Sequence, residues 1–195
     1  MIAHQAGDLL ICTDSSQIQS LKSSTTNESP VDLFESKLIR GSTRLIADLT
    51  EFFRDYRVDE TTFTIYAKGA TRNKGFLLSR FLAWTVLPNY SVSLFCVDEG
   101  SALLTNEKVR KNVDTVTRIT KDEDLKWAWL VFFSDRDLPP PIVSFISRYD
   151  KKELGLAAAS TSSRQVVLSN NQVGRSIGKQ LKLGKAIGSN RTWKN

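Results

Sequence analysis

Apolar runs typical of strands alternate with helical patterns through most of the chain, and this alternation limits the possible folds more than any other feature. The predicted strands cover residues 62–70, 90–98 and 126–134. The predicted helices cover residues 74–87, 102–119 and 139–150. Strands that alternate with helices favour a sheet with helices on its faces. We therefore predict an α/β fold, a single domain whose mostly parallel central sheet is flanked by helices.

Two segments flank this alternation. Ser29 and Pro30, with Asp32 close behind, form a typical helix start. Apolar residues at helical spacing extend the predicted helix to Arg57, with a possible break at Gly41. Near the other end, the runs LGLAAAS and RQVVLSN bracket a short polar turn and predict a hairpin.

The chain of 195 residues has room for one ordinary domain. We assign residues 1–28 to an N-terminal strand and a flexible Ser/Thr-rich linker, 29–170 to the α/β domain and 171–195 to a basic C-terminal helix or tail. No apolar run approaches the roughly 18 residues of a membrane span. We therefore expect no membrane partner. Cys12 and Cys96 match no metal or redox spacing and are read as reduced, so a cytoplasmic or nucleoid-associated protein is expected.

The charge is distributed unevenly. Residues 1–153 carry 20 Lys and Arg against 21 Asp and Glu, a net charge of −1. Residues 154–195 carry seven Lys and Arg and no acid, a net charge of +7. A neutral body with a basic end is typical of a protein that attracts a polyanion such as DNA or RNA. A solubilising tail and a segment that docks on an acidic protein are the alternatives.

The last predicted helix, residues 172–186, is amphipathic. Val173, Ile177 and Leu181 share one face, and cations share the opposite face. The predicted nucleic-acid contacts of this region are Arg175, Lys179, Lys182, Lys185, Arg191 and Trp193. Trp193 either stacks on a base or docks into a groove of the body. The glycines of GRSIGKQ do not have phosphate-loop spacing, and Gln180 stands where a metal-binding Ser or Thr is needed.

A second cationic segment lies between the strand at 62–70 and the helix at 74–87. Lys68, Arg72 and Lys74 surround two glycines there, and Arg80 follows one or two helical turns later. Backbone N–H groups at a helix start, together with these cations, would make a phosphate seat. A solvated charged loop is the alternative.

Few residues are suited to catalysis. His4 is the only histidine, which excludes the usual Ser-His and Cys-His arrangements unless the N-terminus folds over the body. Asp98 and Glu99 follow a predicted strand, at the sheet edge where ligands usually bind. They are candidate catalytic residues and Mg²⁺ ligands, with Glu51 as a third acid. The alternative is that Asp-Glu-Gly simply forms a turn, and no cofactor is then required.

The order of elements in residues 90–160 resembles the rear half of the restriction-endonuclease-like (PD-(D/E)xK) fold. The resembling stretches are SVSLFCVDEG, then a helix, then KWAWLVFFS, LPPPIVSFIS and LGLAAAS. The resemblance implies nucleic-acid binding or metal-dependent cleavage. The family's acid-x-Lys triplet is not intact, because Gly100 and Ser101 follow Glu99. A lost or rebuilt catalytic site is therefore expected.

A shorter stretch, TFTIYAKGATRNKGFLLSRFL, resembles the Alba-type chromatin and RNA-binding fold over about 20 residues. It also implies nucleic acid as the partner. The leading hypothesis is thus a nucleic-acid-binding α/β protein that is not catalytic. The alternatives are a metal-dependent nuclease that uses Asp98 and Glu99, and an adaptor or homo-oligomer subunit that docks on an acidic partner through the Val173, Ile177 and Leu181 face.

Overall fold

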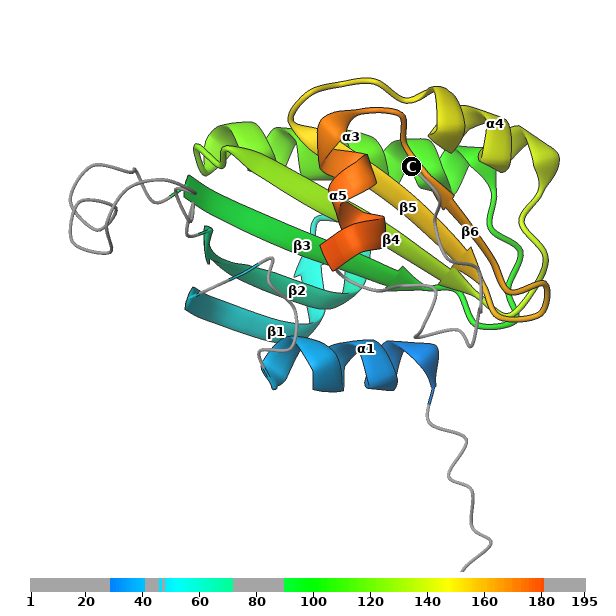
Figure 1. Ribbon diagram of the computed structural model, residues 1–195, viewed down its shortest axis with the longest axis horizontal. Helices are drawn as coiled ribbons and strands as arrows, with labels where there is room; N and C mark the ends of the chain where they lie inside the picture. The colour runs from blue at the N-terminus through cyan, green and yellow to red at the C-terminus, as the bar shows by residue number, and fades with distance from the viewer. Residues whose placement is uncertain (1–28, 41–45, 47, 72–89, 181–195) are drawn as a thin grey trace, which may run out of the picture.

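A six-stranded sheet organises the computed structural model, which describes residues 29–40, 46, 48–71 and 90–180 (Figure 1). The helices are α1 (Pro30–Ile39), α3 (Asn106–Asp122), α4 (Pro140–Arg148) and α5 (Gln172–Gln180). The strands are β1 (Asp48–Val58), β2 (Thr61–Thr71), β3 (Tyr90–Asp98), β4 (Trp127–Ser134), β5 (Leu154–Ser160) and β6 (Gln165–Leu168). The predicted helix at 74–87 lies outside the described residues.

The strands lie in chain order across the sheet, but their directions differ from the prediction. β3 pairs in parallel with β4, and β4 with β5. The pairs β1–β2, β2–β3 and β5–β6 are antiparallel. The α/β class is confirmed, whereas the expectation of a mostly parallel sheet is wrong. Only Asp59 and Glu60 separate β1 from β2, and so short a connection joins antiparallel strands.

The second half of the predicted helix at 29–57 is a strand. The helix start is correct, since the Ser29 hydroxyl accepts a hydrogen bond from the Val31 N–H at 3.3 Å. In β1, Asp55 has a φ of +52° and is not paired with the opposite Thr64, and the register with β2 shifts between Leu49 and Glu51. Phe53 and Tyr56 consequently stack on the same side, 5.9 Å apart, despite their odd separation. This irregularity imitates helical spacing and explains the error.

The strand and helix predictions between residues 90 and 170 hold to within a few residues. The middle of the sheet is apolar on both faces, since β3 buries six consecutive residues and β4 buries seven. This burial is typical of parallel strands between two helical layers. The predicted hairpin is the β5–β6 pair. No described helix combines the length and apolarity needed to span a membrane.

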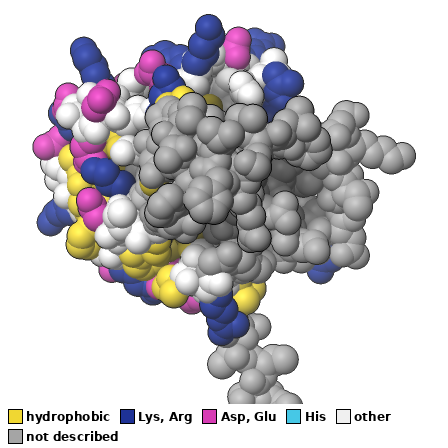
Figure 2. Space-filling model, turned by 60° about the vertical axis from the view of Figure 1, so that its left-hand side comes forward, with side chains coloured by type: hydrophobic (Ala, Val, Ile, Leu, Met, Phe, Trp, Pro, Cys, Tyr) yellow, Lys and Arg dark blue, Asp and Glu magenta, His cyan; other side chains and the backbone are white. Residues whose placement is uncertain are grey.

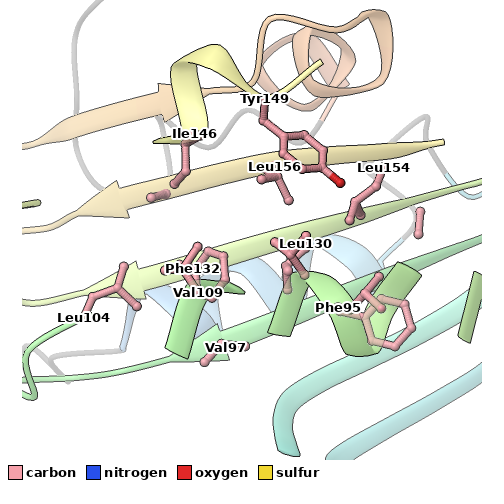
Figure 3. Packing of buried hydrophobic residues seen from close by; sticks show 14 of the residues in the cluster. Phe95, Val97, Leu104, Val109, Leu130, Phe132, Ile146, Tyr149, Leu154 and Leu156 are labelled. Carbon is pink, nitrogen blue, oxygen red and sulfur yellow. The ribbon is translucent and has the colours of Figure 1, made fainter. Parts of the chain in front are cut away.

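Helices α3 and α4 cover one face of the sheet. Ile146 of α4 and Val109 of α3 pack on Leu130, Phe132 and other strand residues (Figure 3). The ring of Tyr149 extends from the end of α4 toward Leu154 and Leu156 of β5 (Figure 3). α3 begins at Thr105, whose hydroxyl accepts a hydrogen bond from the Lys108 N–H at 3.2 Å.

Helices α1 and α5 cover the opposite face. Phe34 of α1 packs against Phe133 of β4 with ring centroids 5.6 Å apart. Ile177 of α5 is fully buried in the same cluster, together with Trp129 and Ala157. In Figure 1, α5 lies in front of the sheet and α3 behind it. The sheet therefore separates two apolar cores, one under each pair of helices.

Candidate functional site

Asp98 and Glu99 lie at the carboxyl end of β3, where the sequence predicts them, but their side chains do not converge. Asp98 is exposed, and its Oδ1 accepts a hydrogen bond from the Gly100 N–H at 3.0 Å. Gly100 has a φ of +51°, which suits glycine in a tight turn. Asp98 thus acts in the strand-to-helix turn that the sequence offers as the alternative to a metal site.

Glu99 is buried against the start of α3. Its side chain is 2% exposed, and its Oε2 lies 2.6 Å from Nζ of Lys108. Its Oε1 has no hydrogen-bond partner among the described residues. The ion pair ties α3 to the carboxyl end of β3, and one carboxylate oxygen is already committed to Lys108.

The acids that follow β4 are also committed to local hydrogen bonds. Thr161 donates its hydroxyl to Asp135 at 3.0 Å, and Ser162 donates to Asp137 at 2.7 Å. Neither acid caps α4, which begins at Pro140 without a side-chain cap. These acids join the β4–α4 loop to the turn between β5 and β6.

Glu51 does not reach this edge. It lies on β1 opposite Lys68, which in turn lies opposite Ser93 of β3. Ser93 is five residues before Asp98, so roughly 17 Å of strand separates the two positions. Within the described residues, no group of three His, Cys, Asp or Glu side chains could hold a metal ion. The proposed set of Asp98, Glu99 and Glu51 is therefore not assembled as a Mg²⁺ site.

Lys68 is engaged by acids. Its Nζ lies 2.6 Å from Glu123 Oε2 and 3.8 Å from Glu51 Oε1. The hydrogen bond with Glu123 raises the pKa of Lys68 above its usual range. A phosphate would have to compete with two carboxylates for this cation. The other members of the predicted phosphate seat, Arg72, Lys74 and Arg80, lie outside the described residues.

Tyr66 lies beside this ion pair and donates a hydrogen bond of 3.4 Å to Glu123. Burial raises the pKa of Tyr66, and the negative charge of Glu123 raises it further. Above about pH 10 the unfolded chain releases the Tyr66 proton, which the folded chain retains. The folded state then binds more protons, so the free energy of unfolding falls as the pH rises.

This alkaline loss of stability should be smaller in a Tyr66→Phe variant. The two proteins should differ by no more than about 1 kcal/mol at pH 8, because only one long hydrogen bond is lost. Between pH 10 and pH 11.5 the wild-type chain should lose more stability than the variant. Urea unfolding at each pH measures the difference, and identical alkaline profiles would contradict the role of Tyr66.

The first part of the predicted basic helix, Gln172–Gln180, is formed and docked, and residues 181–186 lie outside the described residues. Trp129 Nε1 donates hydrogen bonds to the Val173 carbonyl at 3.2 Å and to the Ser176 hydroxyl at 3.1 Å. Val173 and Ile177 share a face, as predicted, and this face packs against the sheet. Arg175 is exposed on the outer side of the helix. Lys179 lies one turn further along α5, and Lys182, Lys185, Arg191 and Trp193 lie outside the described residues.

This helix approaches the sheet more closely than its amphipathic pattern predicts. A Cβ atom on Gly155 of β5 would come within 2.7 Å of the Gly174 N atom. Asn171 secures the helix start, because its Oδ1 accepts from the Gly174 N–H at 2.6 Å and its Nδ2 donates to the Leu154 carbonyl at 2.7 Å. The glycines of GRSIGKQ thus serve helix–sheet packing rather than phosphate binding. Their spacing of four residues is the signal that points to this close approach.

Cys96 is fully buried on β3 and free. Burial raises the pKa of its thiol well above the usual range, which makes the reactive thiolate unfavourable.

Comparisons of the chain with protein-family models, with curated proteins and with solved structures found no match in any of the three.

Proposed function

We propose that the protein binds nucleic acid without cutting it, through the exposed Arg175 of α5, the neighbouring Lys179 and the acid-free chain that follows. One observation carries the proposal: α5 uses its apolar and glycine face against the sheet, which leaves Arg175 exposed on the outside. The segment from residue 154 to the C-terminus has seven cations and no acid. A phosphate backbone is the ligand that such a field attracts most strongly.

Five described cations of the body are paired with acids. Lys68, Lys108 and Lys111 each lie within 2.8 Å of a carboxylate. Arg54 pairs with Asp32 and Glu35, and Arg118 pairs with Asp59. Blue and magenta side chains accordingly intermingle on the face of the molecule seen in Figure 2. A cation that is paired with an acid attracts a polyanion less strongly than a cation without a nearby acid.

The order of elements from β3 to β5 adds support. Strand, helix, strand, helix and strand follow each other between Tyr90 and Ser160, as the resemblance to the restriction-endonuclease-like fold implies. The acid-x-Lys triplet of that family is missing from the end of β3. Binding without cleavage agrees with both facts.

The two alternatives have less support. A metal-dependent nuclease would need acids that converge, whereas Asp98 binds the Gly100 N–H and Glu99 binds Lys108. An adaptor that docks through the apolar face of α5 would need that face to be free. Val173 and Ile177 are already packed against the sheet.

A change of Arg175 and Lys179 to alanine should weaken nucleic-acid binding. The slope of log K against log salt is negative, and the loss of two phosphate contacts should reduce its magnitude by roughly 1.4 for a single strand. Fluorescence anisotropy of a labelled 20-nucleotide strand, titrated at several salt concentrations, measures both affinity and slope. Changing Lys182, Lys185 and Arg191 to serine in the full chain should reduce the magnitude of this slope further.

The matched control is the double variant Lys111→Ala and Arg118→Ala. It removes the same charge from α3, on the opposite face of the sheet, from cations already paired with Glu60 and Asp59. Equal losses of affinity in the control and in the α5 variant would show only a general charge effect. Binding that does not respond to salt at all would overturn the proposal.

A further inference from the structure

We infer that the groove between α3 and α4 is a second contact site for the nucleic acid, and that the ligand is a single strand that bends around the end of the sheet. This inference rests on the proposed function and names its ligand class. It depends on three features: the charge of the groove, its connection to α5 and its position on the opposite face of the sheet.

The groove has a volume of about 450 Å³, and its charged lining residues are mostly cations. Arg110 of α3, Arg148 of α4 and Lys151 line it, with Asp150 as the only acid in the lining. None of these three cations forms an ion pair with another described residue. The guanidinium of Arg110 lies 5.0 Å from the centre of the half-buried Phe145 ring. The groove thus combines positive charge that is unpaired within the described residues with the flat Arg110 guanidinium, on which a base can stack.

A second groove provides the internal comparison. It is larger, about 710 Å³, and lies between α3 and the β1–β2 turn. Its acidic lining residues are Asp59, Glu60, Glu107 and Asp114. Of its three cations, Lys111 and Arg118 are paired with two of those acids, and the third is Arg110. Four acids against three cations repel a phosphate, whereas three cations against one acid attract it. Charge therefore selects the smaller groove.

A short hydrogen-bonded path connects this groove to α5. The Arg175 guanidinium donates to the Asn170 carbonyl at 2.9 Å, and the Asn170 N–H donates to the Tyr149 carbonyl at 3.2 Å. Asn171 donates to the Lys151 carbonyl at 2.6 Å. The loop after α4 and the loop before α5 are therefore side by side, at the end of the sheet where β5 begins. Lys151 and Arg175 lie on these adjoining segments, so the cations of α5 continue into the groove.

The two sites lie on opposite faces of the sheet. Taking about 10 Å for each packed layer, a ligand must reverse its direction within roughly 20 Å to contact both. Duplex DNA has a persistence length of about 150 base pairs and resists such a bend. A single strand bends freely over this distance. A duplex can reach α5 alone, so the groove should contribute only to single-strand binding.

The test compares a labelled 20-nucleotide single strand with a duplex of the same sequence, with the full chain as the binder. For the single strand, the double variant Arg110→Ala and Arg148→Ala should reduce the magnitude of the negative slope of log K against log salt by roughly 1.4. Its duplex binding should be unchanged. The variant Arg110→Lys and Arg148→Lys should retain the slope. The Lys111→Ala and Arg118→Ala protein is the control, and equal urea midpoints show that each variant is folded.

Each other outcome has a distinct meaning. If the wild-type chain binds but the groove variant binds the single strand equally well, the groove inference is wrong and the proposed function stands. If the groove variant loses duplex and single-strand binding equally, the single-strand assignment is wrong. If the groove binds tripolyphosphate but its loss leaves strand binding intact, the groove is a small-anion site instead. If the wild-type chain binds neither nucleic acid, the proposed function itself fails.

Discussion

A Gly174→Ala variant should lose about 3 kcal/mol of stability, the upper part of the range for overpacked sites. The new Cβ atom would overlap Ser169 Oγ and come within 2.8 Å of the Ser169 carbonyl oxygen. Ser169 is itself committed, because its hydroxyl accepts a hydrogen bond from the Leu156 N–H at 2.9 Å. The backbone must therefore shift, and the hydrogen bonds of Trp129 to α5 should weaken. Urea unfolding followed by tryptophan fluorescence measures the loss.

Gly178→Ala in the same helix is the matched control. Its Cβ atom would meet only Leu168 Cδ1, at 2.9 Å, and that is the end of a flexible side chain. Alanine also favours the helix over glycine by about 1 kcal/mol. The variant should therefore be as stable as the wild-type chain or more so. Equal destabilisation by both substitutions would show that helix propensity, not close packing, decides these positions.

A Lys108→Met variant should also be strongly destabilised, by about 3 kcal/mol. The substitution leaves the Glu99 carboxylate buried at 2% exposure, with no ion-pair partner among the described residues. Half of the Lys108 side chain is exposed, so water should relieve part of the cost and keep it at the lower end for buried pairs. Urea unfolding at neutral pH measures this change.

The double variant Lys108→Met and Glu99→Gln completes the cycle. Removing the charge of Glu99 should recover most of the stability, because a neutral amide is easier to bury than a carboxylate. Glu99→Gln alone should cost less than Lys108→Met alone. A double variant as unstable as Lys108→Met would mean that the packing of the lysine stem, rather than its charge, holds α3 to β3.

Local patterns predicted most of the elements correctly. The run YSVSLFCVD is β3 from its first residue to its last, and the polar turn between LGLAAAS and RQVVLSN closes the β5–β6 hairpin. These elements could be predicted because burial on both faces, or a tight turn, is recorded in adjacent residues. β1 could not, because the left-handed Asp55 changes which residues share a side of the strand.

The candidate site was only partly predictable, because its side-chain contacts join residues that are far apart in the sequence. The position of Asp98 and Glu99 at the end of β3 follows from the sequence, but the partners of their carboxylates do not. Lys108 reaches Glu99 only because α3 packs back over the sheet. The groove cations Arg110, Arg148 and Lys151 are separated in the sequence, and no spacing links them.

The sequence by itself determined the α/β class, the amphipathic pattern of α5 and the excess of seven cations over acids after residue 153. Composition and short-range periodicity carry these properties, and they do not depend on which segments meet. Only the tertiary structure decided the strand directions, which acids were already paired and which groove kept its cations free. Those properties depend on contacts between residues far apart in the chain, where the distance between charges and the loss of water decide the energy.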